Sequence, residues 1–532
     1  MNKNYLPLYF AFAIVLGICI GGFFNGGTSS GNLFASASSN EIKIKRLINY
    51  IQTDYVDSVD TDLLLDGAIK QILGKLDPHS TYIPKERLQQ VTENMQGNFV
   101  GIGVQFRMIK DSITVIQPIK GGPSIKAGIQ AGDRILIANT DTLYGKRLSS
   151  NSVPKYLKGE PNTNVALQIY RKTNDSLFTV SITRGNVNIK SVAVSYMVND
   201  SIGYIKLERF ARTSYREFKT ALTNLQNKGI TDLVLDLRGN GGGYIDIANK
   251  IVDEFLEDQK LIVFTKDNKG NVNESFATSR GSFEKGGLYI LIDQNSASAS
   301  EIVAGALQDN DRGTTIGRRS FGKGLVQEEK DLGDGSAIRL TTARYYTPTG
   351  RSIQKPYEKG NGKGYSKDLN NRIRNGELLS KDSIKVNDSL QFKTPKGNIV
   401  YGGGGIVPDV FVAIDTTSYM SNLYYNTIQN FAFDLVDKNR KKFSQLSLDS
   451  FIETYQIDSA YMAYIKEIND GLSDLRQNLN QTYSPSINSK KMIQQYLKAS
   501  IANQIYGDEG FYRIIQSDDH MILKVLELET TN

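Results

Sequence analysis

The sequence predicts an α/β protein that carries an inserted β-rich segment and helical N- and C-terminal regions. Short apolar runs alternate with helix-like patterns in residues 186–350, which is typical of an α/β fold. Residues 98–184 instead show short β-like runs divided by Gly turns, whereas apolar residues in 41–95 recur at helical spacing. Because 532 residues exceed the size of one ordinary domain, we expect several structural units.

The N-terminal segment is apolar for about the length that crosses a bilayer. Residues Leu6 to Phe24 form this stretch, and Lys3 before it indicates that the rest of the chain is exported. We expect residues 1–27 to be a retained membrane anchor. The alternative is a signal segment that is removed, with cleavage at the small residues 35–37.

Composition excludes several classes of protein. The chain has one cysteine, Cys19, so intrachain disulfides, Cys-rich zinc sites and an ordinary thiol protease are excluded. Its two histidines, His79 and His520, argue against a His-based metal site and limit the possible bases for a nucleophilic serine. The net charge of +7 is spread among interleaved acidic and basic residues, which argues against a nucleic-acid partner.

The pattern along the chain suggests domain boundaries. We predict an N-terminal helical region over 28–95, an α/β core over 186–417 and a C-terminal helical region over 418–532. A polar stretch at 355–400 interrupts the core and is interpreted as a surface insertion. A turn beside a proline contains His79, which we interpret first as a packing residue.

Residues 96–185, between these regions, resemble a PDZ domain. The resemblance rests on the loop Gly101-Ile102-Gly103 that enters a strand, and on the Ala-Gly and Ala-Gly-Asp-Arg-Ile pattern in residues 127–135. Such domains bind a peptide C-terminus as an added strand while loop amides hold its carboxylate. The alternative is that these glycines only form hairpin turns.

A glycine-rich loop follows the strand predicted at residues 233–237. It reads Gly-Asn-Gly-Gly-Gly from Gly239 to Gly243, but a dinucleotide-binding fingerprint would need glycine where Tyr244 stands. What remains is a row of backbone N–H groups at the mouth of a helix, which suits an anion or a developing oxyanion. A simple tight turn is the alternative, although it would not need three consecutive glycines.

A second loop, from Gly317 to Lys323, fits the first seven positions of a P-loop. The next residue of a P-loop is Ser or Thr, which holds magnesium, but this chain has Gly324 there. The nucleotide-hydrolase interpretation therefore loses its support. Lys323 lies between two glycines, where a lysine has little packing value; an exposed loop lysine is the alternative interpretation.

A third loop carries Ser298 between a strand predicted at 288–293 and a helix predicted at 299–307. A serine at such a turn is lifted to the sheet edge, and the helix N-terminus favours an oxyanion. An ordinary N-cap is the alternative. Because histidine is scarce, a serine nucleophile needs another base, and lysine can supply it when burial lowers its pKa from about 10.4.

The motif Ser296-Ala297-Ser298-Ala299-Ser300-Glu301 is followed by Phe321-Gly322-Lys323-Gly324 and by Gln327. Together these residues resemble the C-terminal (tail-specific) processing peptidases of the S41 serine peptidase family. The separation of 25 residues between Ser298 and Lys323 is the family's spacing and selects the middle serine. Further matches extend the resemblance over most of residues 41–415, at Asp77–Tyr82, Asp236–Gly243 and Arg344–Gln354.

The resemblance implies a ClpP/crotonase-like α/β peptidase core, an inserted PDZ domain and endopeptidase activity without metal or cofactor. Its roles carry over as Ser298 for the nucleophile, Lys323 for the base and Gln327 for the residue that orients the lysine. The implied oxyanion donors are the Ala299 amide and one glycine amide, with Gly243 favoured over Gly242. One departure is visible, because the stretch at 355–400 separates two motifs that are nearly continuous in the family's short form.

The resemblance also sets expectations for partners and location. We expect protein or peptide substrates with exposed C-termini. The sequence leaves open whether the chain forms a homo-oligomer or binds an adaptor protein. We expect the protein to be located in the bacterial cell envelope, with an inner-membrane anchor and a periplasmic catalytic region. If the N-terminus is cleaved, we expect the protein to be secreted to the periplasm. A catalytically silent relative that binds peptides is the rival interpretation.

Overall fold

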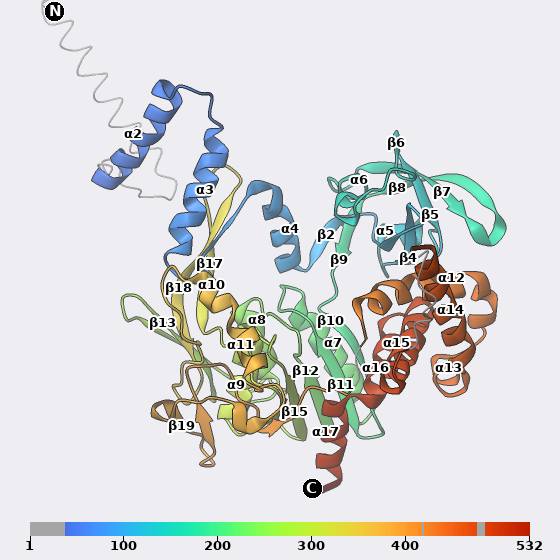
Figure 1. The fold of residues 1–532 in the computed structure, drawn as a ribbon. Helices are drawn as coiled ribbons and strands as arrows, with labels where there is room; N and C mark the ends of the chain where they lie inside the picture. Colours follow the sequence, from blue (N-terminus) through green and yellow to red (C-terminus); the bar gives the residue numbers. More distant parts are fainter. Residues whose placement is uncertain (1–37, 418–419, 476–484, 532) are drawn as a thin grey trace, which may run out of the picture. The chain divides into compact units, whose positions relative to one another are not determined.

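The structure, a computed structural model, describes residues 38–417, 420–475 and 485–531 (Figure 1). The described residues belong to two compact units, one ending at Ile69 and the other beginning at Lys70. The predicted anchor or signal segment at 1–27 lies outside the described residues. Among the helices that are described, none has the length and apolar character needed to cross a membrane.

The first unit contains α2 (Ser39–Asp54) and the start of α3 (Thr61–Gly74). Ser38 caps α2, because its side chain accepts from Glu41 N and its own amide donates to the Glu41 carboxylate. No residue of α2 is buried in the described chain, although its apolar residues recur at helical spacing. The predicted helical character of this region is confirmed.

A mostly parallel sheet forms the centre of the second unit. Its strands lie in the order β10 (Val192–Met197), β11 (Ile202–Leu207), β12 (Asp232–Asp236), β15 (Gly287–Ile292), β16 (Thr314–Gly317) and β21 (Val410–Phe411). Only β10 runs antiparallel to its neighbour among these described strands. Every residue of β11 is buried, as expected of a strand covered on both faces.

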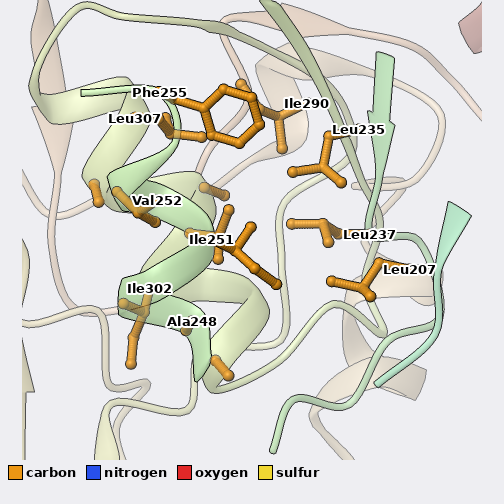
Figure 2. Packing of buried hydrophobic residues seen from close by; sticks show 14 of the residues in the cluster. Leu207, Leu235, Leu237, Ala248, Ile251, Val252, Phe255, Ile290, Ile302 and Leu307 are labelled. Carbon is orange, nitrogen blue, oxygen red and sulfur yellow. The ribbon is translucent and has the colours of Figure 1, made fainter. Parts of the chain in front are cut away.

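Helices cover both faces of this sheet. On one face lie α7 (Ser214–Gln226), α8 (Ile245–Asp253) and α9 (Ala299–Asp309). Figure 2 shows side chains of α8 and α9 packed against those of the strands. On the other face lies α17 (His520–Thr531), whose Met521 and Ile522 pack with Tyr204 and Ile316. The end of the predicted C-terminal helical region therefore packs with the α/β core.

A second sheet lies beside the first. It runs β1 (Thr81–Ile83), β18 (Ala337–Tyr346), β13 (Leu261–Asp267) and β14 (Val272–Phe276), and β17 (Leu325–Asp331) also pairs with β18. Helix α4 (Lys85–Gln96) follows β1. The pairing of β17 and β1 with the same strand brings the loop that contains Lys323 close to the turn that contains His79.

The PDZ-like segment forms a β-rich domain with its own apolar core. Its sheet runs β3 (Val104–Ile109), β4 (Ser112–Pro118), β5 (Arg134–Ala138), β7 (Asn164–Arg171) and β8 (Ser176–Thr183), with β6 (Asp141–Thr142) beside β5 and the short helices α5 (Pro123–Lys126) and α6 (Pro154–Leu157). The chain enters through β2 (Asn98–Gly101) and leaves through β9 (Gly185–Asn188), which pair with each other. This pairing is the geometry of an inserted domain.

The remaining C-terminal helices form a separate cluster with an aromatic core. They are α12 (Asn422–Phe443), α13 (Leu448–Thr454), α14 (Asp458–Leu475), α15 (Ile487–Tyr506) and α16 (Asp508–Ile515). Helix α12 contacts the PDZ-like domain, because Phe433 packs with Ile109 and Asp437 pairs with Arg134 at 3.2 Å and with Lys172 at 3.1 Å.

The stretch at 355–400 contains α10 (Gly362–Ser366), α11 (Asp368–Arg374), β19 (Gln391–Lys393) and β20 (Ile399–Tyr401). The sequence predicts a surface insertion here, and many of its residues are exposed. However, Arg372, Glu377 and Leu378 are buried. The insertion therefore contributes to the interior of the core as well as to its surface.

Candidate active site

Ser298 occupies a strained turn between β15 and α9. Its backbone has φ +56° and ψ −116°, a region that non-glycine residues rarely adopt. The glycine loop approaches this turn so closely that a Cβ on Gly242 would lie 2.8 Å from the Ser298 Cβ. Glycine is therefore required at 242 to bring the two loops together.

Lys323 and Gln327 are linked to the turn that contains His79. Lys323 Nζ donates to Gln327 Oε1 at 2.7 Å, and Gln327 Nε2 donates to the backbone carbonyl of His79. The Asp77 carboxylate holds this turn by accepting from the His79 amide at 2.8 Å. The sequence interpretation of His79 as a packing residue missed the contact of its carbonyl with Gln327, because a backbone carbonyl leaves no signal in the sequence.

The environment of Lys323 favours a neutral amine. Burial, followed by repulsion from Arg339, lowers the pKa of Lys323 from 10.5 to about 8, while the carboxylates of Glu301 and Asp77 oppose this shift. With that pKa, about one tenth of the amines are neutral at pH 7. A neutral amine can accept the proton of a hydroxyl, which is what a general base must do.

Glu301 connects the serine turn to the lysine loop (residues 317–324). Its Oε2 accepts from the amides of Ser298 and Lys323, both at 2.9 Å. Its Oε1 accepts from Ser320 Oγ at 2.5 Å and from the Gly322 amide at 2.7 Å. Burial raises the pKa of this carboxyl, and the four hydrogen bonds oppose the rise.

Tyr345 makes a second connection, since its hydroxyl contacts the carbonyls of Ser298 at 3.2 Å and Lys323 at 2.7 Å. Glu301 and Tyr345 thus hold together two loops that lie far apart in the sequence. Both residues lie within motifs of the sequence, but the sequence indicates no role for either.

Two backbone amides near Ser298 have no hydrogen-bond partner within the described chain. The Ala299 amide lies at the N-terminus of α9, and the Gly243 amide lies in the glycine loop. The Gly242 amide, in contrast, donates to Asn240 Oδ1 at 2.9 Å. Of the two glycines named from the sequence, the one whose amide is available to an oxyanion is therefore Gly243.

The base of the glycine loop is fixed by a buried charge network. The Asp236 carboxylate accepts from Lys206 Nζ at 3.1 Å and from Arg238 at 2.6 Å. Burial alone would raise the pKa of Asp236, but Arg238 and Lys206 outweigh burial and lower it. Arg238 also pairs at 2.6 Å with Asp519, which ties the segment before α17 to this loop.

A cavity of about 420 Å³ collects these groups. Ser298, Lys323, Gln327 and residues 241–244 line it, together with side chains from α4 and with Arg339 and Tyr345. The structure therefore brings the predicted nucleophile, base and orienting residue to one cavity. No hydrogen bond joins Ser298 Oγ to Lys323 Nζ in the part of the chain that is described, and such contacts often close only when substrate binds.

The predicted peptide-binding loop lies elsewhere, in the PDZ-like domain. Ile102 is buried, and its carbonyl accepts from the amide and the hydroxyl of Ser124 at 2.8 and 2.7 Å. Gly103 has a φ of +78°, so the turn after Ile102 requires glycine. Among the described residues, Gly101, Ile102 and Gly103 do not line the Ser298 cavity.

The fold and this cavity define a serine peptidase with an α/β core and an inserted PDZ domain. Comparison with protein families agrees: the model of peptidase family S41 matches residues 201–361 and that of the PDZ domain matches 100–182. The N-terminal domain of the activating protease CtpB matches 27–87, and a family of unknown function matches 419–507.

Curated relatives point to the same family. A carboxy-terminal-processing protease of Bartonella bacilliformis is 39% identical over 309 residues, which cover 57% of this chain and 70% of that protein. The carboxy-terminal processing protease CtpB of Bacillus subtilis is 33% identical over 316 residues, which cover 59% of this chain and 65% of that protein. A solved photosystem II D1 C-terminal processing protease is 26% identical, with a TM-score of 0.36, over 70% of this chain and 86% of that chain.

This chain therefore belongs to peptidase family S41. The resemblance stated from the motifs, the fold class and the enzyme class are confirmed, and relatives of the chain are named as carboxy-terminal-processing proteases.

Proposed function

We propose that the chain is a serine endopeptidase that acts by a Ser–Lys mechanism on exported proteins selected by their C-terminal tails. The observation that carries the mechanism is the buried Lys323 amine, with its lowered pKa, at the same cavity as Ser298. The neutral amine takes the hydroxyl proton of Ser298 as its oxygen attacks the scissile carbonyl. Gln327 orients the amine, since its amide oxygen accepts from Nζ.

The oxyanion is stabilised by the amides of Ala299 and Gly243, with the helix dipole of α9 adding positive potential. Collapse of the tetrahedral intermediate expels the amine of the leaving peptide, which takes the proton from Lys323. An acyl-enzyme on Ser298 remains. Water then attacks this ester, again with Lys323 as base, and releases the new C-terminus.

Selection by C-terminal tails is supported by the edge of the PDZ sheet. Strand β3 lies at this edge, so a peptide can pair with it as an added strand, and the loop Gly101-Ile102-Gly103 that precedes β3 can hold a terminal carboxylate. An apolar N-terminal stretch from Leu6 to Phe24 supports export to the cell envelope, with either an anchor or a cleaved signal.

Two substitutions test the mechanism. Ser298→Ala and Lys323→Ala are each expected to abolish cleavage of an unfolded protein such as casein, because the first removes the nucleophile and the second the base. Full activity in either variant would refute the Ser–Lys assignment. Tail selection is tested separately, by comparing the binding of a peptide with a free C-terminal carboxylate and of the same peptide amidated; equal affinities would refute it.

A further inference from the structure

A buried arginine of the insertion at 355–400 binds the backbone of the lysine loop. Arg372, on α11, donates from Nη1 to the Ser320 carbonyl at 3.0 Å and from Nη2 to the Arg319 carbonyl at 2.6 Å. Its side chain is only 5% exposed. These two carbonyls belong to the residues three and four places before Lys323, so the position of Arg372 bears directly on the backbone that carries the base.

A buried carboxylate fixes this arginine. Glu377, also in the insertion, accepts from Arg372 Nε at 2.7 Å and from Arg319 at 2.7 and 2.5 Å. A guanidinium that binds two carbonyls and a carboxylate at once has a defined orientation, because its donors form a rigid planar fork. The three side chains therefore define one geometry for the start of the lysine loop.

A second residue of the insertion supports the turn behind Gln327. The Tyr365 hydroxyl lies 2.8 Å from His79 Nε2, and its ring contacts the His79 ring edge to face at 5.1 Å. The carbonyl of the same histidine accepts from Gln327, which in turn accepts from Lys323 Nζ. A chain of contacts thus runs from the insertion to the amine.

Lys355, the first residue of the insertion, also contacts the lysine loop. Lys355 Nζ lies 3.9 Å from the centre of the Phe321 ring and 4.1 Å from that of Tyr365, and it pairs with Asp368 at 3.0 Å. The Lys355 amide donates to the carbonyl of Gly322 at 3.0 Å. Backbone and side-chain contacts from the insertion therefore meet the lysine loop on both sides of Phe321.

We propose that Arg372, Glu377 and Tyr365 are positioning residues for the general base, and that the insertion is a brace for the lysine loop. None of these three side chains lines the Ser298 cavity in the described chain, so they do not bind substrate there. They act through the backbone of the loop and through Gln327. This inference rests on the proposed Ser–Lys mechanism and assigns a function to the insertion.

The brace has a consequence that a purely structural insertion lacks. If it holds Lys323 in its buried position, a weakened brace lets water reach the amine, and the pKa of Lys323 rises from about 8 toward 10.5. The pH midpoint of kcat/KM then moves upward. At neutral pH, kcat falls while KM stays nearly constant, because the substrate contacts are intact.

Two substitutions that conserve charge test this proposal in the full chain. Arg372→Lys keeps the charge beside Glu377 but loses the fork that binds both carbonyls, and Tyr365→Phe keeps the ring but loses the contact with His79. The matched control is Arg374→Lys, which changes an exposed arginine on the same helix. The readouts are the pH profiles of kcat and kcat/KM on a fluorogenic peptide and the rate at which a fluorophosphonate labels Ser298.

Both variants are expected to show a higher pH midpoint, and Arg372→Lys a loss of about tenfold to a hundredfold in kcat at pH 7, as for a misplaced catalytic group. The control should match the parent enzyme. A lower melting temperature with an unchanged midpoint in both variants would overturn the proposal, since the insertion would then be only structural.

Failure of the brace and failure of the underlying mechanism give different results. If Lys323→Ala is inactive while Arg372→Lys and Tyr365→Phe retain the parent's profile, the mechanism stands and the brace is refuted. If Lys323→Ala remains fully active, the Ser–Lys mechanism itself is refuted and the brace with it.

Discussion

The pH dependence of cleavage tests the assigned base most directly. Lys323 has a pKa of about 8, so its neutral fraction is about one half at pH 8, one tenth at pH 7 and one hundredth at pH 6. Since only the neutral amine accepts a proton, kcat/KM should fall about tenfold for each pH unit below 7. The assay is cleavage of a fluorogenic peptide, with circular dichroism at each pH to show that the fold persists.

Arg339 provides the matched perturbation. Its positive charge lines the cavity and lowers the pKa of Lys323, so Arg339→Gln should raise the pH midpoint of kcat/KM. A bound peptide excludes water from the amine and should lower the midpoint of kcat below that of kcat/KM. A profile that stays flat down to pH 5, or a midpoint that falls in Arg339→Gln, would refute the reasoning.

Three other substitutions test the buried amine, the glycine loop and the contact between α12 and the PDZ domain. Lys323→Met should raise the free energy of unfolding at pH 7 by at most about 3 kcal/mol, as measured by chemical denaturation. Burial of the protonated Lys323 amine destabilises the fold fully below pH 8, and this cost is lost as pH rises from 8 toward 10.5. Gly242→Ala should reduce kcat by about 100-fold or more, because its Cβ would lie 2.8 Å from the Ser298 Cβ and separate the two loops. Gly241→Ala should not, because a Cβ there meets no atom within 4 Å. Asp437→Ala should weaken the contact between α12 and the PDZ domain by about 1–3 kcal/mol, seen as faster hydrogen exchange at that contact while the α/β core is unchanged.

The sequence predicted the parts of this enzyme that are encoded locally. Ser298 was a candidate because a strand-to-helix turn is a local pattern, and Lys323 because a failed P-loop and the shortage of histidine left it as a possible base. Only the resemblance to a known family joined the two as one site, and the structure places both at one cavity. The inserted β-rich domain was visible for the same reason, since its glycine turns and short strands repeat within a continuous segment.

Contacts between distant segments were not predictable in this way. Most hydrogen bonds of Glu301 and Arg372 go to backbone groups, and a backbone carbonyl or amide carries no side-chain identity that a pattern could reveal. The packing partner of helix α17 was unpredictable for a similar reason. Its apolar face alone does not indicate whether the helix packs on the preceding helices or on the core sheet.

The flanking glycines of Lys323 explain why so many of these distant contacts converge on its loop. Gly322 and Gly324 let the chain pack tightly, since a Cβ on Gly324 would lie 2.9 Å from the backbone nitrogen of Gln354. The same residues leave the backbone with more freedom than any other residue would. A base on a flexible four-carbon stem then has a defined position only if side chains from outside the loop order it. Glu301, beside the serine turn, orders the loop by accepting from the Lys323 amide, and Arg372 of the insertion orders it by binding the Arg319 carbonyl.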